Sequence, residues 1–332
     1  MNIDITSLKG GERAILALRC LYQRRGYACY KMSKFEEYDF YAQNRDFLSS
    51  GDILTFTDTD GRLMALKPDV TLSIVRHARI EPGVVQKIFY DENVYRAPRQ
   101  AGKRGTFREI PQVGLECLGA VDDGCVREVL SLAAESLSLV AESRARVLDV
   151  AHLGVLSAVL DRAEPSARPA LIQCVAEKNI HELTRLCGAE TDTAKYLRAL
   201  VGDCGRPEEA LPALRRDLAD CGPALKCLEQ LERILSALGD GADFSGEAPL
   251  SLNVDLSAVS NLNYYNGIVF RGFIDGIPAA VLSGGQYDRL MERMGHAGGH
   301  AIGFAVYMDL LEPLGFNTGA LRGPAEGRGE GH

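Results

Sequence analysis

Residues 107–119 read FREIPQVGLECLG, and this stretch decides the fold because its side chains alternate as in a β-strand with one buried face. The apolar face carries Val113, Leu115 and Cys117. The opposite face carries Arg108, Gln112, Gly114 and Glu116. An amide and a carboxylate on either side of a glycine leave room for a small ligand against the backbone. A solvated sheet face has the same pattern, so the strand alone leaves both interpretations open.

Hairpins surround this strand along the chain. Residues 84–97, VVQKIFYDENVYRA, predict a partner strand joined through the polar loop 98–106. Residues 53–67 predict a second hairpin whose Asp60-Gly61 pair favours a tight primed turn, and Pro68 and Asp69 predict the start of a helix. Because hairpins outnumber strand-helix-strand crossovers, we expect an α+β fold with a mostly antiparallel sheet flanked by helices.

The composition changes between residues 153 and 246, where Ala, Leu, Glu and Arg dominate and prolines break the pattern. We therefore expect a helical insertion there, set into a discontinuous core of residues 1–152 and 247–318. Residues 319–332 are Gly-rich and charged, which predicts a disordered tail.

The bulk properties exclude several classes of function. A net charge of -8 over 332 residues argues against free nucleic acid as a broad electrostatic partner. No apolar run approaches a membrane span and no signal-peptide pattern opens the chain, so we expect a cytoplasmic protein. The nine cysteines are an odd number without zinc-type spacing, and the histidines form no metal or acid-base pattern. These features predict reduced thiols and no metal.

Other polar residues lie where a ligand pocket needs them, although each has an ordinary structural alternative. The guanidinium of Arg96, on the neighbouring predicted strand, suits a carboxylate or phosphate. Asp69 and Thr71 at a helix start are either capping residues or ligand contacts. Tyr264 and Tyr265 pack either on a ligand ring or in the core, and Tyr287 follows a Gly-Gly pair that permits close approach to the backbone.

Taken in order, these segments resemble the catalytic domain of histidyl-tRNA synthetase, a class II synthetase. The resemblance is carried by KPDVT (67–71) with Arg76, by the second-motif segment 94–116, by LNYYNGIVF (262–270), and by SGGQYD (283–288) with AIGFAVYMDLL (301–311). It implies a class II synthetase-like sheet. The histidine-binding positions of the family fall on Asp69, Thr71, Arg96, Gln112, Glu116, Tyr264, Tyr265 and Tyr287.

The chain departs from the synthetase pattern where ATP chemistry needs cations. The third-motif arginine is replaced by Leu310, the catalytic arginine before the leucine of LNYY by Ser260, and an arginine after Gly-Gly by Gln286. The second motif also lacks its glutamate near Pro98. Loss of one fixed donor to a developing anion costs about 10²–10³ in rate. The resemblance therefore implies a subunit without catalytic residues and without a cofactor.

Only about twenty residues follow MDLL (308–311), so the tRNA anticodon-binding domain of the synthetases is not expected here, nor is tRNA as a partner. A synthetase body of this kind resembles the regulatory subunits of the short-form ATP phosphoribosyltransferase, which catalyses the first step of histidine biosynthesis. That resemblance implies a hetero-oligomer with the short catalytic subunit, which needs the synthetase-like subunit for activity, and feedback by L-histidine. It also implies a homodimer core through the first-motif region, residues 26–41.

Two alternatives remain. A divergent or truncated histidyl-tRNA synthetase-like enzyme would still activate an amino acid and would exchange pyrophosphate into ATP. An interaction scaffold with a vestigial pocket would keep the partner but bind no histidine. The sequence also leaves open whether inhibitory histidine occupies this pocket or a subunit interface.

Overall fold

The computed structural model describes residues 8–48, 53–97, 99–100, 103–104, 107–141, 143–239, 249–258, 262 and 264–314. Ser260, the region of Pro98 and the predicted tail 319–332 therefore lie outside the described residues. Among the described helices, none combines the length and apolar character that crossing a lipid bilayer requires.

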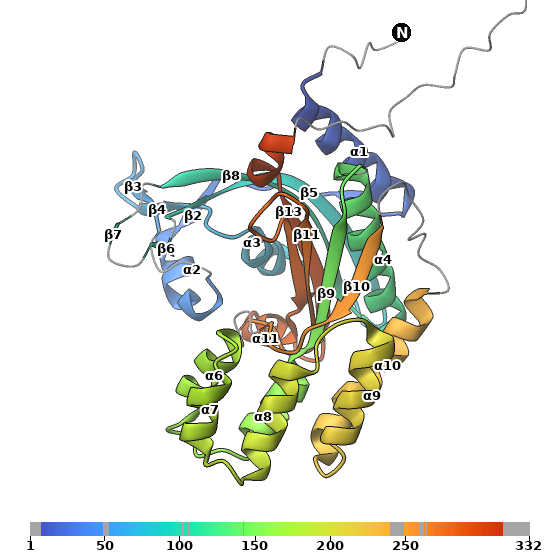
Figure 1. Ribbon diagram of the computed structural model, residues 1–332. Helices are drawn as coiled ribbons and strands as arrows, with labels where there is room; N and C mark the ends of the chain where they lie inside the picture. Colours follow the sequence, from blue (N-terminus) through green and yellow to red (C-terminus); the bar gives the residue numbers. More distant parts are fainter. Residues whose placement is uncertain are drawn as a thin grey trace, which may run out of the picture.

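An eight-stranded sheet forms the centre of the molecule (Figure 1). Its strands, in spatial order, are β1 (Ala28–Cys29), β5 (Val85–Arg96), β8 (Arg108–Gly119), β13 (His300–Tyr307), β12 (Leu282–Gln286), β11 (Ile268–Ile274), β9 (Arg146–His152) and β10 (Leu250–Val254). Only the two outermost pairings, β1 with β5 and β9 with β10, are parallel. The expected mostly antiparallel sheet is confirmed.

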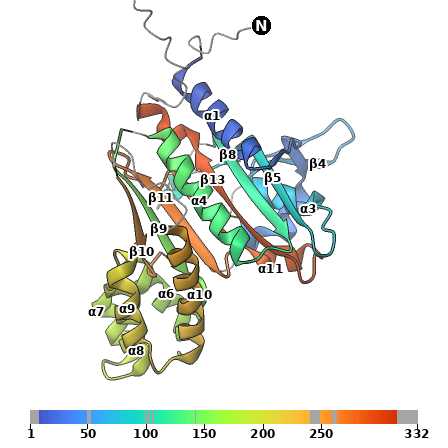
Figure 2. The same cartoon turned by 90° about the vertical axis from the view of Figure 1, so that its right-hand side faces the viewer.

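Two long helices, α1 (Gly10–Arg24) and α4 (Asp123–Val140), cover one face of this sheet (Figure 2). The side chain of Asp122 caps α4 by accepting a hydrogen bond from the backbone N–H of Cys125. The apolar side chains of β8, including Val113 and Leu115, are fully buried in the core beneath these helices. The polar residues of β8 consequently face the other side of the sheet.

A smaller sheet lies beside the first, and a helix that contributes to the candidate site follows its last strand along the chain. It consists of β2 (Phe35–Glu37), β4 (Leu63–Leu66) and β3 (Thr55–Thr57), accompanied by α2 (Tyr38–Gln43), the 3₁₀ turn η2 (Arg45–Phe47) and α3 (Val70–His77). The predicted β3–β4 hairpin is present. The predicted primed turn is wrong, because Gly61 has a positive φ of 80° but Asp60 does not. The Asp58 side chain instead accepts bonds from the backbone N–H groups of Asp60 and Arg62 and closes a wider loop.

The remaining short elements connect these layers. A two-stranded ribbon, β6 (Arg99–Gln100) with β7 (Lys103–Arg104), lies in the loop between β5 and β8, and α11 (Asp288–Arg293) follows β12. The last described element is a 3₁₀ helix, η3 (Met308–Leu314). The proline at position 313 provides no N–H for an α-helical hydrogen bond.

A group of helices packs beyond one end of the large sheet (Figure 1). They are α5 (Leu153–Leu160), α6 (Arg168–Ala176), α7 (Ile180–Cys187), α8 (Asp192–Gly202), α9 (Pro207–Asp217) and α10 (Gly222–Gly239). Their buried side chains, such as Leu197 and Leu231, belong to the same hydrophobic cluster as the core of the sheet. The helix group is thus packed onto the sheet domain, with α10 touching both α4 and α5.

Candidate functional site

A cavity of about 200 Å³ opens on the face of the large sheet that α1 and α4 leave uncovered. It receives side chains from α3, β5, β8, β12 and β13 and from the segments preceding β11 and α11. Eight of its lining residues are those expected from the sequence: Asp69, Thr71, Arg96, Gln112, Glu116, Tyr264, Tyr265 and Tyr287. Residues more than 200 positions apart in the chain therefore meet in one pocket.

Glycines and alternation on the strands create the space for this pocket. Gly303 of β13 is paired with Glu116 of β8, and a methyl group on Gly303 would occupy the position of the Glu116 carboxylate. Gly114 is likewise enclosed, because a methyl group there would lie about 2.5 Å from the hydroxyl of Tyr90. Positions 114 and 303 therefore require glycine, because polar side chains of the pocket occupy the space that a Cβ atom would fill.

Glu116 is the polar centre of the cavity, with only 1% of its surface exposed. One carboxylate oxygen accepts a hydrogen bond from the Thr71 hydroxyl at 2.8 Å, and the other accepts one from the Tyr287 hydroxyl at 2.6 Å. Burial raises the pKa of Glu116 to about 8, although these two donors oppose the shift. The neutral form of Glu116 therefore predominates at pH 7, and a cationic group of a ligand beside it would favour ionisation.

The Asp69 carboxylate caps α3 and also lines the cavity. Its Oδ1 accepts a hydrogen bond from the N–H of Leu72 at 3.0 Å and so caps α3. Its Oδ2 pairs with the Arg96 guanidinium at 3.2 Å, while Nε of Arg96 donates to the carbonyl of Pro68 at 2.6 Å. Burial raises the pKa of Asp69 and the Arg96 charge opposes that shift. Capping and pocket formation are therefore done by the same carboxylate.

Three tyrosines, Tyr264, Tyr265 and Tyr287, form a wall of the pocket. The ring centroids of Tyr264 and Tyr265 are 4.7 Å apart, and those of Tyr264 and Tyr287 are 5.9 Å apart. Burial raises the pKa of all three phenols well above the usual value, so they are neutral hydrogen-bonding groups. The rings supply apolar walls and the hydroxyls supply donors and acceptors, which suits a small aromatic zwitterion.

Sequence reasoning missed other residues that line the cavity, above all Tyr90, Ser283 and Tyr307. Their place follows from strand pairing, since Tyr90 lies opposite Gly114 and Tyr307 lies opposite Gln112. The hydroxyls of Ser283 and Tyr307 lie 2.6 Å apart. No spacing within a single segment could have identified them, because each is brought to the pocket by a neighbouring strand.

Gln286 and Leu310, the described positions at which cations of the synthetase pattern are replaced, do not line the cavity. Oε1 of Gln286 accepts the N–H of Ile268 at 2.7 Å, so this side chain fastens the start of β11. Leu310 is partly buried and packs against the main hydrophobic core. Ser260 lies outside the described residues. Arg96 is thus the cation lining the cavity among the described residues, and Asp69 already pairs with it.

The arrangement can hold a small polar molecule but offers little for phosphate chemistry. Two carboxylates, an amide and several hydroxyls fit an ammonium group and an imidazole N–H. Within the described ranges, no three His, Cys, Asp or Glu side chains are grouped as metal ligands.

The chain is similar to known proteins along most of its length. The family model described as histidyl-tRNA synthetase matches residues 8–311. A protein from Anaeromyxobacter sp., named ATP phosphoribosyltransferase regulatory subunit, is 32% identical over 324 residues, which cover 94% of this chain and 90% of the relative. One of the same name from Caldanaerobacter subterraneus is 30% identical over 264 residues, or 77% of this chain, and here the match spans 66% of the relative's length.

Solved structures resemble the chain in fold. A protein from Bacillus halodurans, described as an ATP phosphoribosyltransferase regulatory subunit/histidyl-tRNA synthetase, has a TM-score of 0.76 at 24% identity and covers 92% of this chain and 79% of its own. A chain of the ATP phosphoribosyl transferase complex from Thermotoga maritima has a TM-score of 0.69 at 18% identity, with coverage of 92% and 98%. The expected class II synthetase-like fold is confirmed.

Proposed function

The chain belongs to the histidyl-tRNA synthetase family, and within it to the ATP phosphoribosyltransferase regulatory subunits, and from this premise we propose that it is the non-catalytic regulatory subunit of a short-form ATP phosphoribosyltransferase. In this role it is required for the first step of histidine biosynthesis and takes part in feedback regulation by histidine. The observation that carries the proposal is the convergence of eight polar residues on one small cavity around the buried Glu116.

In this proposal, the ligand of the pocket is L-histidine. The carboxylates of Glu116 and Asp69 attract the ammonium group and an imidazole N–H, while the Arg96 fork and the Gln112 amide suit the ligand carboxylate. Among the described residues the Gln112 side chain has no hydrogen-bond partner although it is 3% exposed, which leaves its amide available to a ligand.

The lack of catalysis in this proposal rests on charge. Activation of an amino acid with ATP places developing negative charge on phosphate, and fixed cations stabilise it. The uncharged Leu310 packs on the core and the neutral Gln286 is engaged with the backbone of β11. An amino-acid pocket is retained while the groups that would serve phosphate are replaced, which is what a sensing subunit needs.

The partner in this proposal is the short catalytic subunit, because the names of the relatives describe a regulatory subunit and the Thermotoga maritima structure is a complex.

A homodimer core is also part of the proposed function. The smaller sheet supports this with exposed apolar side chains, since Phe35 is 46% and Phe56 38% exposed and their rings meet at 5.5 Å. A cytoplasmic location fits the nine cysteines, all of which are free thiols.

Feedback follows if histidine binds one state of the assembly more tightly than another, since a ligand with equal affinity for both shifts nothing. Titration calorimetry with L-histidine, combined with histidine-dependent exchange of pyrophosphate into ATP, tests the proposal. We expect heat of binding without exchange. Exchange would support the alternative of an amino-acid-activating enzyme, and absence of any heat would support the scaffold with an empty pocket.

A further inference from the structure

Strand β2 presents its two faces to very different surroundings. Phe35 and Glu37 point outward and are exposed, whereas Glu36 between them is only 9% exposed. The buried face of β2 lies against α3, the helix whose first turn lines the ligand cavity. A carboxylate buried at this contact needs partners, and all of its described partners are on α3.

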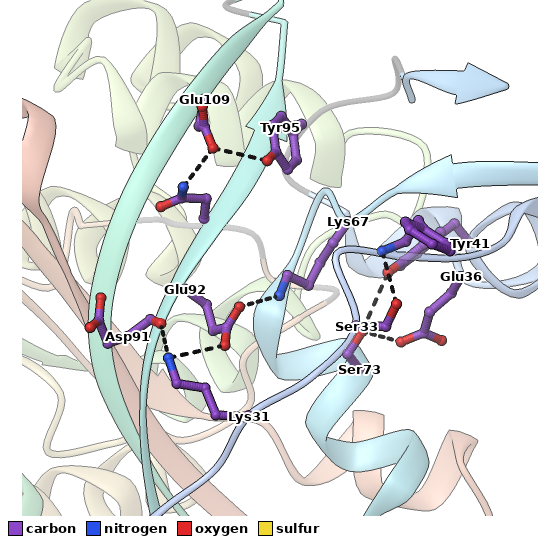
Figure 3. Close-up of polar contacts among 12 residues, drawn as sticks. Lys31, Ser33, Glu36, Tyr41, Lys67, Ser73, Asp91, Glu92, Tyr95 and Glu109 are labelled. Atoms are coloured by element: carbon purple, nitrogen blue, oxygen red, sulfur yellow. Dashed lines mark hydrogen bonds and ion pairs between the residues drawn. The ribbon is translucent and has the colours of Figure 1, made fainter.

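The Glu36 carboxylate forms hydrogen bonds with two residues of α3. One oxygen accepts a hydrogen bond from the Ser73 hydroxyl, and the other accepts one from the Arg76 guanidinium at 2.7 Å. Ser73 is fully buried, and its hydroxyl also lies 3.3 Å from that of Tyr41 (Figure 3). The Arg76 guanidinium in turn lies 4.4 Å from the centre of the Phe40 ring. The inner face of α3 is therefore fixed to β2 and α2.

The beginning of α3 is held separately. Lys67 is 0% exposed, and its ammonium group donates to Glu92 of β5 at 3.0 Å (Figure 3). Arg96 binds the Pro68 carbonyl and Asp69. These contacts fix the chain before α3. The rotation of α3 about its own axis is determined instead by the contacts along the sides of the helix. Ser73 and Arg76 provide polar contacts of this kind, in addition to the packing of the buried Leu72, Ile74 and Val75 in the core.

Thr71 is the group that depends on this rotation. It lies in the first turn of α3, two residues before Ser73, and its hydroxyl reaches across to Glu116 at 2.8 Å. A helix of two turns moves as one body, so a change at Ser73 and Arg76 displaces Thr71. Asp69, by contrast, keeps Arg96 as a partner.

We propose that Glu36 is a positioning residue for the amino-acid cavity, which holds α3 through Ser73 and Arg76 so that Thr71 binds Glu116. The inference rests on the proposed binding of histidine. It also connects the cavity to the outer face of the smaller sheet, because Glu36 lies between Phe35 and Glu37 on that strand.

The pH dependence of binding reports the position of Thr71. The titratable and charged groups coupled to Glu116 are Asp69 of α3, Tyr90 of β5, Tyr264, Tyr265 and Tyr287. The Thr71 hydrogen bond lowers the pKa of Glu116. Loss of that bond raises the pKa of Glu116 further, and the pH below which histidine affinity declines moves upward. A purely structural role for Glu36 would lower the melting temperature without moving this pH.

The test is calorimetric titration of the full chain with L-histidine between pH 6 and 9, for the wild type, Glu36→Gln and the matched control Glu37→Gln. Glu37 is the exposed neighbour on the same strand. We expect Glu36→Gln to raise Kd about tenfold and to shift the pH midpoint upward, since hydrogen bonds to charged groups contribute enough for such a change. Glu37→Gln leaves both quantities at their wild-type values.

A second variant, Ser73→Ala, keeps the Glu36–Arg76 ion pair and removes one hydroxyl. We expect it to shift Kd and the pH midpoint in the same direction as Glu36→Gln, by less. The inference is overturned if the wild type binds histidine and Glu36→Gln binds it with the same Kd and pH midpoint. A wild type that gives no heat with histidine overturns the proposed ligand and this role for Glu36 together.

Discussion

Gly303 lies directly opposite Glu116 in the pairing of β13 with β8, and the Glu116 carboxylate occupies the space into which a side chain at position 303 would project. The glycine thereby sets where the polar centre of the cavity sits. The carboxylate is held there by hydroxyl donors from two elements, Thr71 of α3 and Tyr287 before α11.

Replacement of Gly303 by alanine is therefore expected to act on the proposed histidine site. The added methyl group displaces the Glu116 carboxylate from Thr71 and Tyr287, and overpacking of this kind costs about 1–3 kcal/mol of stability. We expect Gly303→Ala to raise the Kd for histidine at least about tenfold in calorimetry. Gly202→Ala on α8, where a Cβ has open space around it, is the matched control. Equal affinity of Gly303→Ala and the wild type would show that Glu116 does not contact the ligand.

The pKa of Glu116 predicts how binding depends on pH. In the proposed complex the ionised carboxylate attracts the ammonium group of histidine, and with a pKa of about 8 it must lose a proton on binding at lower pH. Histidine affinity should fall as pH decreases below about 8, by up to about tenfold per unit. Glu116→Gln should bind more weakly and lose this dependence, as measured by calorimetry at several pH values. A wild-type affinity that is constant from pH 6 to 9 would contradict the assignment.

The same shift predicts a stability difference. When no histidine is added, the folded chain keeps a proton on Glu116 at pH values between the ordinary pKa of a glutamate and about 8, where the unfolded chain has released it. The contribution of this residue to folding consequently declines as pH rises through that range. Glu116→Gln, which cannot ionise, should melt at a higher temperature than the wild type at pH 8, and the difference should shrink towards pH 5. A lower Tm than the wild type at pH 8 would argue that Glu116 stabilises the fold.

The sequence predicted the parts of the site that a pattern within a single segment encodes. The strand face with Gln112 and Glu116 and the helix start at Asp69 follow from periodicity and capping, and both are present in the structure. Tyr90 and Tyr307 were missed because cross-strand neighbours are set by register, which no single segment reveals. The tight turn predicted at Asp60-Gly61 is a wider loop, because hydrogen bonds from backbone N–H groups to the Asp58 side chain determine its shape.

The proposed homodimer predicts an effect of surface charge on self-association. Phe35 is 46% exposed and packs edge-on against Phe56, which exposes apolar area on the smaller sheet. We expect Phe35→Asp to shift the chain towards monomer in sedimentation equilibrium. Ile180→Asp, on the similarly exposed start of α7, controls for added charge and should leave the dimer intact. Loss of the dimer in the control alone would place the interface on the helix group instead.

We also expect the free energy of unfolding to depend on pH through His152, which precedes the helix group. Nδ1 of His152 accepts the N–H of Gly154 at 3.0 Å, so Nε2 carries the proton and donates to Gln230 of α10 at 3.0 Å. Burial lowers the pKa of His152, so its stabilising contribution is complete above the ordinary value of 6.5 and declines as pH falls below it.

His152→Asn retains an acceptor for the cap of α5 but cannot titrate in this range. We expect its free energy of unfolding, from urea titrations at pH 7 and pH 5, to depend less on pH than that of the wild type. His181→Asn, at an exposed position, should keep the wild-type dependence. An unchanged pH dependence in His152→Asn would show that the histidine is not the group responsible.

The measurement that tests the regulatory role most directly is the rate of phosphoribosyl transfer by a short-form catalytic subunit, with and without this chain and with increasing L-histidine. We predict a low rate for the catalytic subunit alone, a higher rate when the chain is added, and a decline of that higher rate as histidine fills the cavity. With Glu116→Gln, the stimulation should persist while the response to histidine weakens. A catalytic subunit whose rate is the same with and without the chain would contradict the account.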